Sequence, residues 1–379
     1  MRVYLLVALV AACVTLLTTP LARWVAMRTG AMTAVRARDV HQVPTPRLGG
    51  IAMLLGLWAA FVLASRMPFL AGVFTASNEA LAILLGATMV CLLGVADDIW
   101  DLDWMTKLAG QVLAAGVMAW QGVQLITVPI AGVTIGSSRL SLFATVLVVV
   151  VAMNAVNFVD GLDGLAAGLI AIGGTAFFGY TYLLTQDTNP TDYSDLASLA
   201  TVALVGACLG FLPHNFHPSR IFMGDSGSML IGLVIAAAAI VVTGRIDPAR
   251  LSEGQAVPAF LPILLPLAVL VLPLLDMILA VVRRVSQGKS PFHPDRMHLH
   301  HRLLALGHTH RRAVVLMYLW TAVFAFGAAS LITFTVAQAA VGLGVGALVA
   351  LALTLGPLRP QRSRPGAPIT TAVEEKHVV

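Results

Sequence analysis

Long apolar runs, separated by short loops that carry most of the charged residues, constrain this chain more than any other feature of its sequence. Hydrophobic residues make up 58% of the 379 positions and charged residues 11%, whereas a soluble domain carries about 25% charged residues. A helix of about 20 apolar residues crosses the hydrocarbon core of a bilayer. The pattern therefore predicts an all-α polytopic membrane protein, a bundle of about eleven transmembrane helices. The expected spans are residues 3–20, 49–65, 79–96, 107–122, 141–158, 164–184, 197–213, 227–243, 259–281, 314–335 and 338–357.

The domain organisation follows from the same pattern. One integral-membrane domain is expected over residues 1–357, followed by a disordered cytoplasmic tail over residues 358–379 that is rich in Pro, Arg and Thr. Cys13, Cys91 and Cys208 fall in apolar runs, so they indicate small buried hydrophobes and no disulfide framework. The net charge of +5 does not indicate a nucleic-acid partner, because the basic residues lie in short loops beside the bilayer.

The distribution of Lys and Arg predicts the orientation. With the N-terminus outside, 18 of these 23 residues fall on the cytoplasmic side, since each expected span moves the chain across the bilayer once. The chain is therefore expected to be N-out and C-in, as a multi-pass membrane protein. This assignment also places nearly all the unusual polar motifs, and hence the expected catalytic loops, on the cytoplasmic face.

The most unusual motif, Asn154-Ala-Val-Asn157-Phe-Val-Asp160-Gly-Leu-Asp163-Gly164, lies inside an apolar run. An ionised side chain at mid-bilayer costs roughly 2.5–3.5 kcal/mol on insertion scales. The two glycines favour a geometry in which one helix ends near Asp160 and the next begins after Asp163, with both aspartates in the turn. The alternative is a polar turn without chemistry.

Two further motifs precede it. The segment Asp39-Val-His41-Gln-Val-Pro-Thr-Pro-Arg47-Leu-Gly-Gly50 offers His41 and Arg47 as phosphate or nucleotide donors, and its two glycines allow close backbone approach. Its alternative is a juxtamembrane anchor on lipid headgroups. The adjacent Asp97 and Asp98 repel one another unless a metal ion or a cationic side chain lies nearby, and Lys107 could reach a phosphate. The alternative there is a solvated acidic turn.

Three polar motifs follow the central one. Pro213-His-Asn215 leads into Phe222-Met-Gly-Asp225-Ser-Gly-Ser, where a glycine-rich helix start can bind phosphate, or Asp225 can be a plain N-cap. An aromatic ring such as that of Phe222 suits stacking on a base. Asp276 is interpreted as structural, paired with an arginine. The histidines of the run His298-Leu-His300-His301-Arg302 suggest either zinc or, preferably, an anion-binding cluster for a pyrophosphate.

Together, over residues 36–312, these motifs resemble the polyprenyl-phosphate N-acetylhexosamine-1-phosphate transferase family. The resemblance implies a ten- or eleven-helix bundle that moves a sugar 1-phosphate from a UDP-sugar to a lipid phosphate, uses Mg²⁺ and releases UMP. The broken histidine run, followed by Arg302, looks like the branch that uses UDP-GlcNAc, with undecaprenyl or decaprenyl phosphate as the acceptor. The resemblance also implies a bacterial plasma membrane as the location, and the first membrane step of a cell-envelope polysaccharide or linker as the reaction.

The resemblance also implies roles for individual residues. Asp225 and Asn157 would hold Mg²⁺, for which Mn²⁺ may substitute in the family's chemistry. Asp97 or Asp98 would act on the lipid phosphate, either as a base or as a nucleophile. The residues implied to hold uridine or its ribose are Phe222, Asn215, Asp160 and Asp163, and those implied to contact phosphates or the donor are Lys107, His41, Arg47, His298, His300, His301 and Arg302.

Three alternatives remain open at this point. The donor could be UDP-MurNAc-pentapeptide or another UDP-N-acetylhexosamine. A polytopic transporter would also place aspartates and asparagines at broken helices, although it should put polar groups near mid-membrane and on both faces. A homodimer is possible on this sequence.

Overall fold

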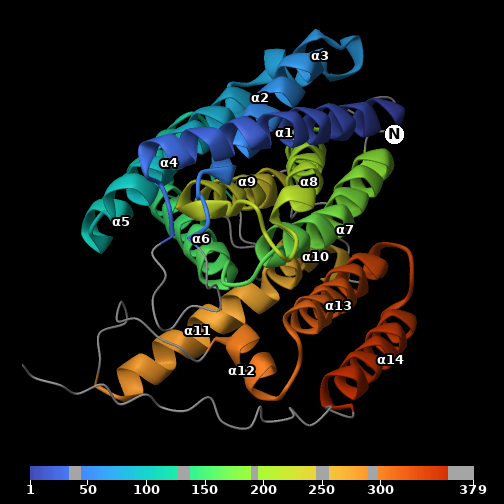
Figure 1. Cartoon of the computed structure of the whole chain (residues 1–379). Helices are drawn as coiled ribbons and strands as arrows, with labels where there is room; N and C mark the ends of the chain where they lie inside the picture. The colour runs from blue at the N-terminus through green and yellow to red at the C-terminus, as the bar shows by residue number, and fades with distance from the viewer. Residues whose placement is uncertain (34–43, 127–136, 189–194, 245–255, 289–297, 357–379) are drawn as a thin grey trace, which may run out of the picture.

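The computed structural model describes residues 1–33, 44–126, 137–188, 195–244, 256–288 and 298–356, and over these ranges the chain is a bundle of helices (Figure 1). Nine of the described helices are long and apolar enough to cross a membrane, or ten if the bent pair α10–α11 is one span. The protein is therefore an all-α polytopic membrane protein, as predicted. The helices are α1 (Arg2–Thr29), α2 (Gly49–Arg66), α3 (Pro68–Ala76), α4 (Glu79–Trp100), α5 (Trp104–Trp120), α6 (Ser138–Val159), α7 (Leu165–Thr188), α8 (Leu196–Asn215), α9 (Gly224–Gly244), α10 (Ala256–Val269), α11 (Val271–Ser286), α12 (Leu299–Ala305), α13 (His310–Ala329) and α14 (Val336–Leu355).

Ten of the eleven expected spans coincide with a single helix, although α5, with 17 residues, is at the short end of the usual range for a span. The span expected over residues 259–281 is instead two helices, α10 and α11, which meet at an angle of 72°. Pro273 explains the break, because proline has no N–H to donate to the carbonyl of Val269 and its ring clashes with that carbonyl. The tail over residues 358–379 lies outside the described residues.

Helix α9 forms the centre of the bundle. It packs against α2, α4, α6 and α8, and nearly all of its residues are buried. Figure 1 places α1 to α3 on one side of this centre and α11 to α14 on the opposite side. A helix that is apolar on all sides and buried on all sides is the expected core of a large helical bundle. The first turn of α9 is thus in a position to contact the ends of the surrounding helices.

Close backbone contacts fix where the ends of α2 and α4 meet α9. A Cβ atom added to Gly50 would collide with the backbone of Gly227, and one added to Gly94 would collide with the backbone of Ser226. Gly50 and Gly94 therefore let two helices touch the start of α9 on their main chains. The close approach predicted for the Gly49-Gly50 pair is confirmed by the hydrogen bonds from the amides of these two glycines to the carbonyls of Phe222 and Met223.

The turn between α6 and α7 has the predicted form. Helix α6 ends at Val159, and α7 begins at Leu165. Gly164 adopts a φ of 75°, a left-handed conformation that glycine adopts without strain. Asp160 and Asp163 are consequently placed in the connecting turn.

Candidate active site

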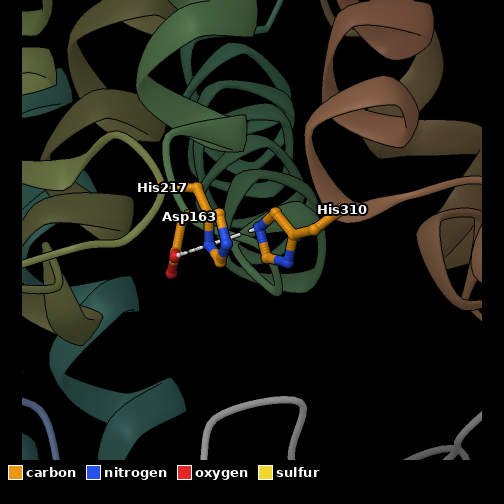
Figure 2. A group of neighbouring side chains, drawn as sticks. All are labelled: Asp163, His217 and His310. Carbon is orange, nitrogen blue, oxygen red and sulfur yellow. Dashed lines mark hydrogen bonds and ion pairs between the residues drawn. The ribbon is translucent and has the colours of Figure 1, made fainter.

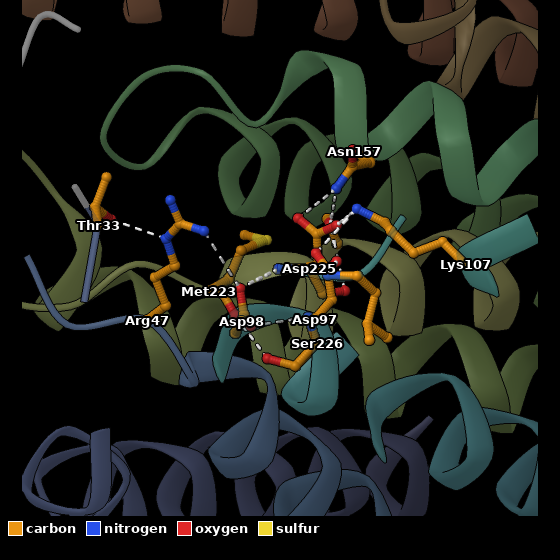
Figure 3. A network of polar contacts seen from close by, with 11 residues as sticks. Thr33, Arg47, Asp97, Asp98, Lys107, Asn157, Met223, Asp225 and Ser226 are labelled. Atoms are coloured by element: carbon orange, nitrogen blue, oxygen red, sulfur yellow. Dashed lines mark hydrogen bonds and ion pairs between the residues drawn. The ribbon is translucent and has the colours of Figure 1, made fainter. Parts of the chain in front are cut away.

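Five helix ends converge at one end of the bundle, where these ends and the segment before α2 contribute polar side chains. The C-terminal ends of α4 and α6 meet the N-terminal ends of α2, α5 and α9 there. Figure 3 shows the resulting network of side chains. Its members come from segments more than one hundred residues apart in the sequence, such as Lys107 and Asp225.

Asp225, in the first turn of α9, is the centre of this network. Its carboxylate accepts hydrogen bonds from Lys107 Nζ and, over 3.0 Å, from Asn157 Nδ2. Lys107 Nζ also donates to Asp97 Oδ2 over 2.9 Å, and Asn157 Nδ2 donates to Ser228 Oγ over 2.9 Å. One carboxylate thus connects the ends of α5, α6 and α9, with Asp97 of α4 joined through the shared lysine.

The two adjacent aspartates of α4 have different partners. Asp97 accepts hydrogen bonds from Lys107 and from the Leu102 amide. Asp98, which is buried, accepts hydrogen bonds from the backbone amides of Asp225 and Ser226 over 3.1 and 3.3 Å. The interpretation of Asp225 as an N-cap is therefore wrong, because the side chain that caps the first turn of α9 is Asp98 from another helix.

Arg47 enters from the segment before α2. Its Nε donates to Thr33 Oγ1 over 3.0 Å, and its guanidinium lies 3.9 Å from Asp98 Oδ1 (Figure 3). The Phe222 amide donates to the Pro46 carbonyl, so this segment runs against the approach to α9. The structure thus places Arg47 at the network, whereas His41 lies outside the described residues.

Asp160 lies just beyond α6, at the end of the bundle. Burial, together with the negative charges of Asp225, Asp98 and Asp163, raises the pKa of Asp160 to about 8, although Arg47 opposes the shift. Near neutral pH this carboxyl group is therefore largely protonated. Four carboxyl groups face two basic side chains in this part of the structure: Asp97, Asp98, Asp160 and Asp225 against Lys107 and Arg47.

The residues expected to hold a divalent cation fit that task by charge and by donor type. Carboxylate and amide oxygens are the protein ligands that Mg²⁺ prefers, and a bound cation would offset the excess of acidic groups. Asn157 directs its amide nitrogen at Asp225 in this arrangement. The oxygen and nitrogen of an amide are interchanged by rotation of its plane, so the same side chain can offer an oxygen ligand.

A second cluster contains Asp163, His217 and His310 (Figure 2). The buried carboxylate of Asp163 accepts hydrogen bonds from His217 Nδ1 over 2.7 Å and from Ser219 Oγ over 2.9 Å. The two imidazole rings are stacked, with centroids 4.2 Å apart and planes 21° from parallel. Because the lone pair of a ring nitrogen lies in the ring plane, two stacked rings do not point at a common metal ion in this arrangement. The cluster joins the α6–α7 turn, the segment after α8 and the start of α13.

Asn215 is the last residue of α8, and Phe222 lies in the connection between α8 and α9. The buried amide of Asn215 accepts a hydrogen bond from the Gly164 amide and donates one to the Ile221 carbonyl, both over 3.0 Å. Asn215 thus joins the connection before α9 to the α6–α7 turn. The backbone of Phe222 is paired with the segment before α2, and its half-buried ring lies at the same end of the bundle.

The histidine-rich segment approaches the network from α12. His298 Nδ1 lies 3.0 Å from Asp276 Oδ2, and the Leu299 amide donates to Asp276 Oδ1 over 2.8 Å. Both of these contacts come from the start of α12, and the expected pairing of Asp276 with an arginine stays a prediction. The ring of His298 packs edge-on against Phe158, the residue after Asn157.

The remaining residues of this segment are less closely placed. The ring of His301 lies 6.2 Å from that of His298, and Arg302 is exposed. His300 is in α12, and its side chain lies outside the described part of the structure. The buried guanidinium of Arg284, in α11, is stacked over the ring of Phe158 at 5.3 Å, a contact that the sequence did not indicate.

Sequence reasoning assigned no role to Ser228, His217, Ser219 or His310. Ser228 had a usable signal, since it lies three residues after Asp225 and hence on the same helix face. His217 and His310 had none, because 93 residues separate them and only the packing of α13 beside α7 brings them together.

The fold and the network define a polytopic membrane enzyme with a charged site at one end of its helix bundle. Residues 80–243 match the model of Glycosyl transferase family 4. The decaprenyl-phosphate N-acetylglucosaminephosphotransferase of Mycolicibacterium smegmatis is 46% identical over 94% of this chain and 89% of its own length. The chain therefore belongs to the polyprenyl-phosphate N-acetylhexosamine-1-phosphate transferase family. This membership excludes the alternative of a transporter.

Two further relatives show how the family divides. A probable undecaprenyl-phosphate N-acetylglucosaminyl 1-phosphate transferase of Bacillus subtilis is 32% identical over 85% of this chain and 83% of its own. A phospho-N-acetylmuramoyl-pentapeptide-transferase of Desulforudis audaxviator is 31% identical over 75% of this chain and 83% of its own. The chain is thus more similar to the Mycolicibacterium smegmatis and Bacillus subtilis proteins, both named for N-acetylglucosamine, than to this pentapeptide transferase.

Proposed function

We propose that this protein transfers GlcNAc-1-phosphate from UDP-GlcNAc to a polyprenyl phosphate and releases UMP. The observation that carries the proposal is the network of carboxylates, Lys107 and Arg47 at the end of a membrane bundle, in a chain whose relatives are named for this transfer. The product would be the first lipid-linked sugar of a cell-envelope polysaccharide or linker.

The bonds that form and break in the proposed transfer determine which chemical groups the site needs. An oxygen of the lipid phosphate attacks the phosphorus that carries the sugar, and the bond from that phosphorus to the bridging oxygen of UMP breaks. Donor and acceptor are both anions, so catalysis of this transfer consists mainly of positioning and charge stabilisation. Lys107 and Arg47 are the basic side chains in the network that can offset the charge of the phosphates.

Asp97 or Asp98 would take the proton from the lipid phosphate or attack the donor as a nucleophile. Of the two, Asp97 shares Lys107 with Asp225, whereas Asp98 is held by the backbone of α9. Of the two adjacent aspartates, Asp97 is therefore the one hydrogen-bonded to Lys107. A nucleophilic route would release about one UMP per site from donor alone, and a direct transfer would release none without acceptor.

Asp225 and Asn157 would hold Mg²⁺, with Mn²⁺ as a substitute. When bound, a divalent cation lowers the repulsion between the phosphates and stabilises the charge on the leaving phosphate. Lys107 contacts Asp225 in this structure, so the lysine would share the carboxylate with the cation or move toward a substrate phosphate. The acidic excess of the network supports this assignment.

The site would face the cytoplasm. The support is the bias of Lys and Arg toward one set of loops, to which all the converging helix ends belong. UDP-sugars are made in the cytoplasm, so this orientation also gives the site access to its donor.

Release of UMP by the purified protein, given UDP-GlcNAc and decaprenyl or undecaprenyl phosphate in detergent, tests the proposal directly. We expect a lipid-linked GlcNAc product in equal amount to UMP. Release of UDP in place of UMP would contradict the proposal, because it would mean that the sugar moves without its phosphate.

A further inference from the structure

A second polar layer lies one helical turn deeper in the bundle than the network around Asp225. Gln111, which is buried in α5, accepts a hydrogen bond at Oε1 from Asn154 Nδ2 over 2.8 Å. Gln111 Nε2 donates to the thioether sulfur of Met229 over 3.1 Å. Asn154 also donates to the carbonyl of Val150 in its own helix. These contacts join α5, α6 and α9 inside the apolar part of the protein.

The two layers are built from the same three helices at matching positions. Gln111 follows Lys107 by four residues in α5, and Met229 follows Asp225 by four residues in α9. Asn154 precedes Asn157 by three residues in α6, which runs in the opposite direction. Since a helix rises 1.5 Å per residue, the deeper layer lies about 5–6 Å below the upper one on the same helix faces.

This arrangement controls the rotation of the helices that carry the upper layer. Apolar packing between membrane helices is weakly directional, because lipid tails offer similar contacts. A hydrogen bond between two amides is directional and is costly to leave unmade away from water. The pair Gln111–Asn154 therefore sets the rotation and depth of α5 against α6, and with them the direction of Lys107 and Asn157.

We propose that Gln111 and Asn154 are positioning residues, which hold α5 and α6 around α9 so that Lys107 and Asn157 both reach Asp225. This inference rests on the proposed function for its kinetic consequences. Neither residue touches the charged network, and a purely structural pair would contribute only to stability.

The substitution Gln111→Met tests the proposal, because it keeps the length of the side chain and removes both amide contacts. We expect kcat to fall at least tenfold, the concentration of Mg²⁺ that gives half-maximal rate to rise several-fold, and KM for UDP-GlcNAc to change less than twofold. The reciprocal exchange Gln111→Asn with Asn154→Gln preserves an amide pair of the same total length, and it should restore part of kcat relative to either single substitution.

Thr88→Val is the matched control. It removes the 3.0 Å hydrogen bond that Trp58 Nε1 donates to Thr88, between α2 and α4 and outside the network. A comparable fall in Tm is expected for Thr88→Val and Gln111→Met, but only the latter should change the Mg²⁺ dependence. Wild-type kcat and Mg²⁺ dependence in folded Gln111→Met protein would overturn the proposal, as would equal kinetic losses in the control.

Measurement of backbone amide hydrogen exchange tests the positioning role independently of the proposed function, because it does not require turnover. Gln111→Met should increase exchange in the first turns of α5, residues 104–111, more than Thr88→Val does. If the wild-type protein released no UMP, the proposed function would fail while this comparison could still be made. Unchanged exchange at the start of α5 in Gln111→Met would overturn the positioning role by itself.

Discussion

The carboxylate of Asp98 accepts a hydrogen bond from the backbone amide of Asp225, 3.1 Å away, and so joins the last turn of α4 to the first turn of α9. A second bond, from the Ser226 amide, reinforces the contact. The first amides of a helix have no partner inside it, and here they are satisfied by a side chain that lies 127 residues earlier in the sequence.

Removing this contact should cost stability in a graded way. Asp98→Ala leaves two amides of α9 without their acceptor, which is expected to lower the free energy of unfolding by about 1–3 kcal/mol. Asp98→Asn keeps an acceptor oxygen, so its stability should stay close to that of the wild type. Thermal unfolding in detergent checks the order. Equal Tm values for Asp98→Ala and Asp98→Asn would contradict the capping role.

Removal of the divalent cation should abolish turnover. Asp225→Asn is expected to remove most of the activity, because it replaces the carboxylate that would hold the cation and that binds Lys107 by a neutral amide. Dialysis against EDTA should give the same loss, reversed by Mg²⁺ or Mn²⁺ in the wild type only. The measurement is UMP release as a function of cation concentration. Normal turnover after treatment with EDTA would refute the metal assignment.

The raised pKa of Asp160 predicts a pH dependence of cation binding. Below about pH 8 this carboxyl group is mainly protonated, and above it the group is charged. A charged Asp160 strengthens the attraction for a cation, so the affinity for Mg²⁺ should rise by about tenfold from pH 7 to pH 9, as the charged fraction grows.

Asp160→Asn should flatten that dependence, and Asp103→Asn provides its control. Asp103 caps α5, and hydrogen bonds from Thr106 lower its pKa, so it stays charged throughout this range. Asn is also a good N-cap, so the control should keep α5 intact. The same slope of affinity against pH in Asp160→Asn and in the wild type would show that another group titrates.

Labelling of single cysteines tests the orientation. In a variant without Cys13, Cys91 and Cys208, Ser286→Cys at the exposed end of α11 should resist an impermeant thiol reagent in intact cells. Asn78→Cys, exposed before α4, should react with it. Membranes opened with detergent should show both sites reactive. The reverse pattern in intact cells would place the site outside the cytoplasm.

Competition between donors tests the sugar specificity. The histidine run is interrupted by Leu299 and followed by Arg302, and the Mycolicibacterium smegmatis protein named for N-acetylglucosamine is 46% identical to this chain, against 31% for the pentapeptide transferase. UDP-GlcNAc should therefore be preferred over UDP-MurNAc-pentapeptide, by roughly 10⁴-fold if polar groups of the site are left without partners by the wrong donor. Equal values of kcat/KM for the two donors would refute this assignment and leave the family unchanged.

Much of the fold could be predicted from hydrophobic runs alone, because each span must satisfy its own backbone hydrogen bonds in lipid. The turn that holds Asp160 and Asp163 was also predictable, from the glycines that end one helix and precede the next. The sharp break between α10 and α11 was not, since a proline inside an apolar run can be accommodated with or without a large bend.

The sequence predicts which residues belong to the site better than it predicts the contacts between them. Placing aspartates and a lysine at the ends of membrane spans costs free energy, so these residues are recognisable as candidates for function. The sequence does not show which of them contact one another. Asp98 and Asp276 both accept hydrogen bonds from backbone amides of other helices, and the sequence does not show which backbone amides a side chain will meet. The pairing of His217 with His310 depends on how α13 packs against α7, which spacing along the chain does not encode.

The absence of side chains at Gly50 and Gly94 has a consequence for motion during catalysis. Because the main chains of α2 and α4 rest directly on the start of α9, these three helices have no layer of side chains that could rearrange and let them slide. Domain-like closure around a substrate at this crossing would require backbone atoms to separate. Conformational change on substrate binding is therefore expected in the half of the site formed by Lys107 and the connecting segments. Asp98 and Arg47 are expected to keep their positions.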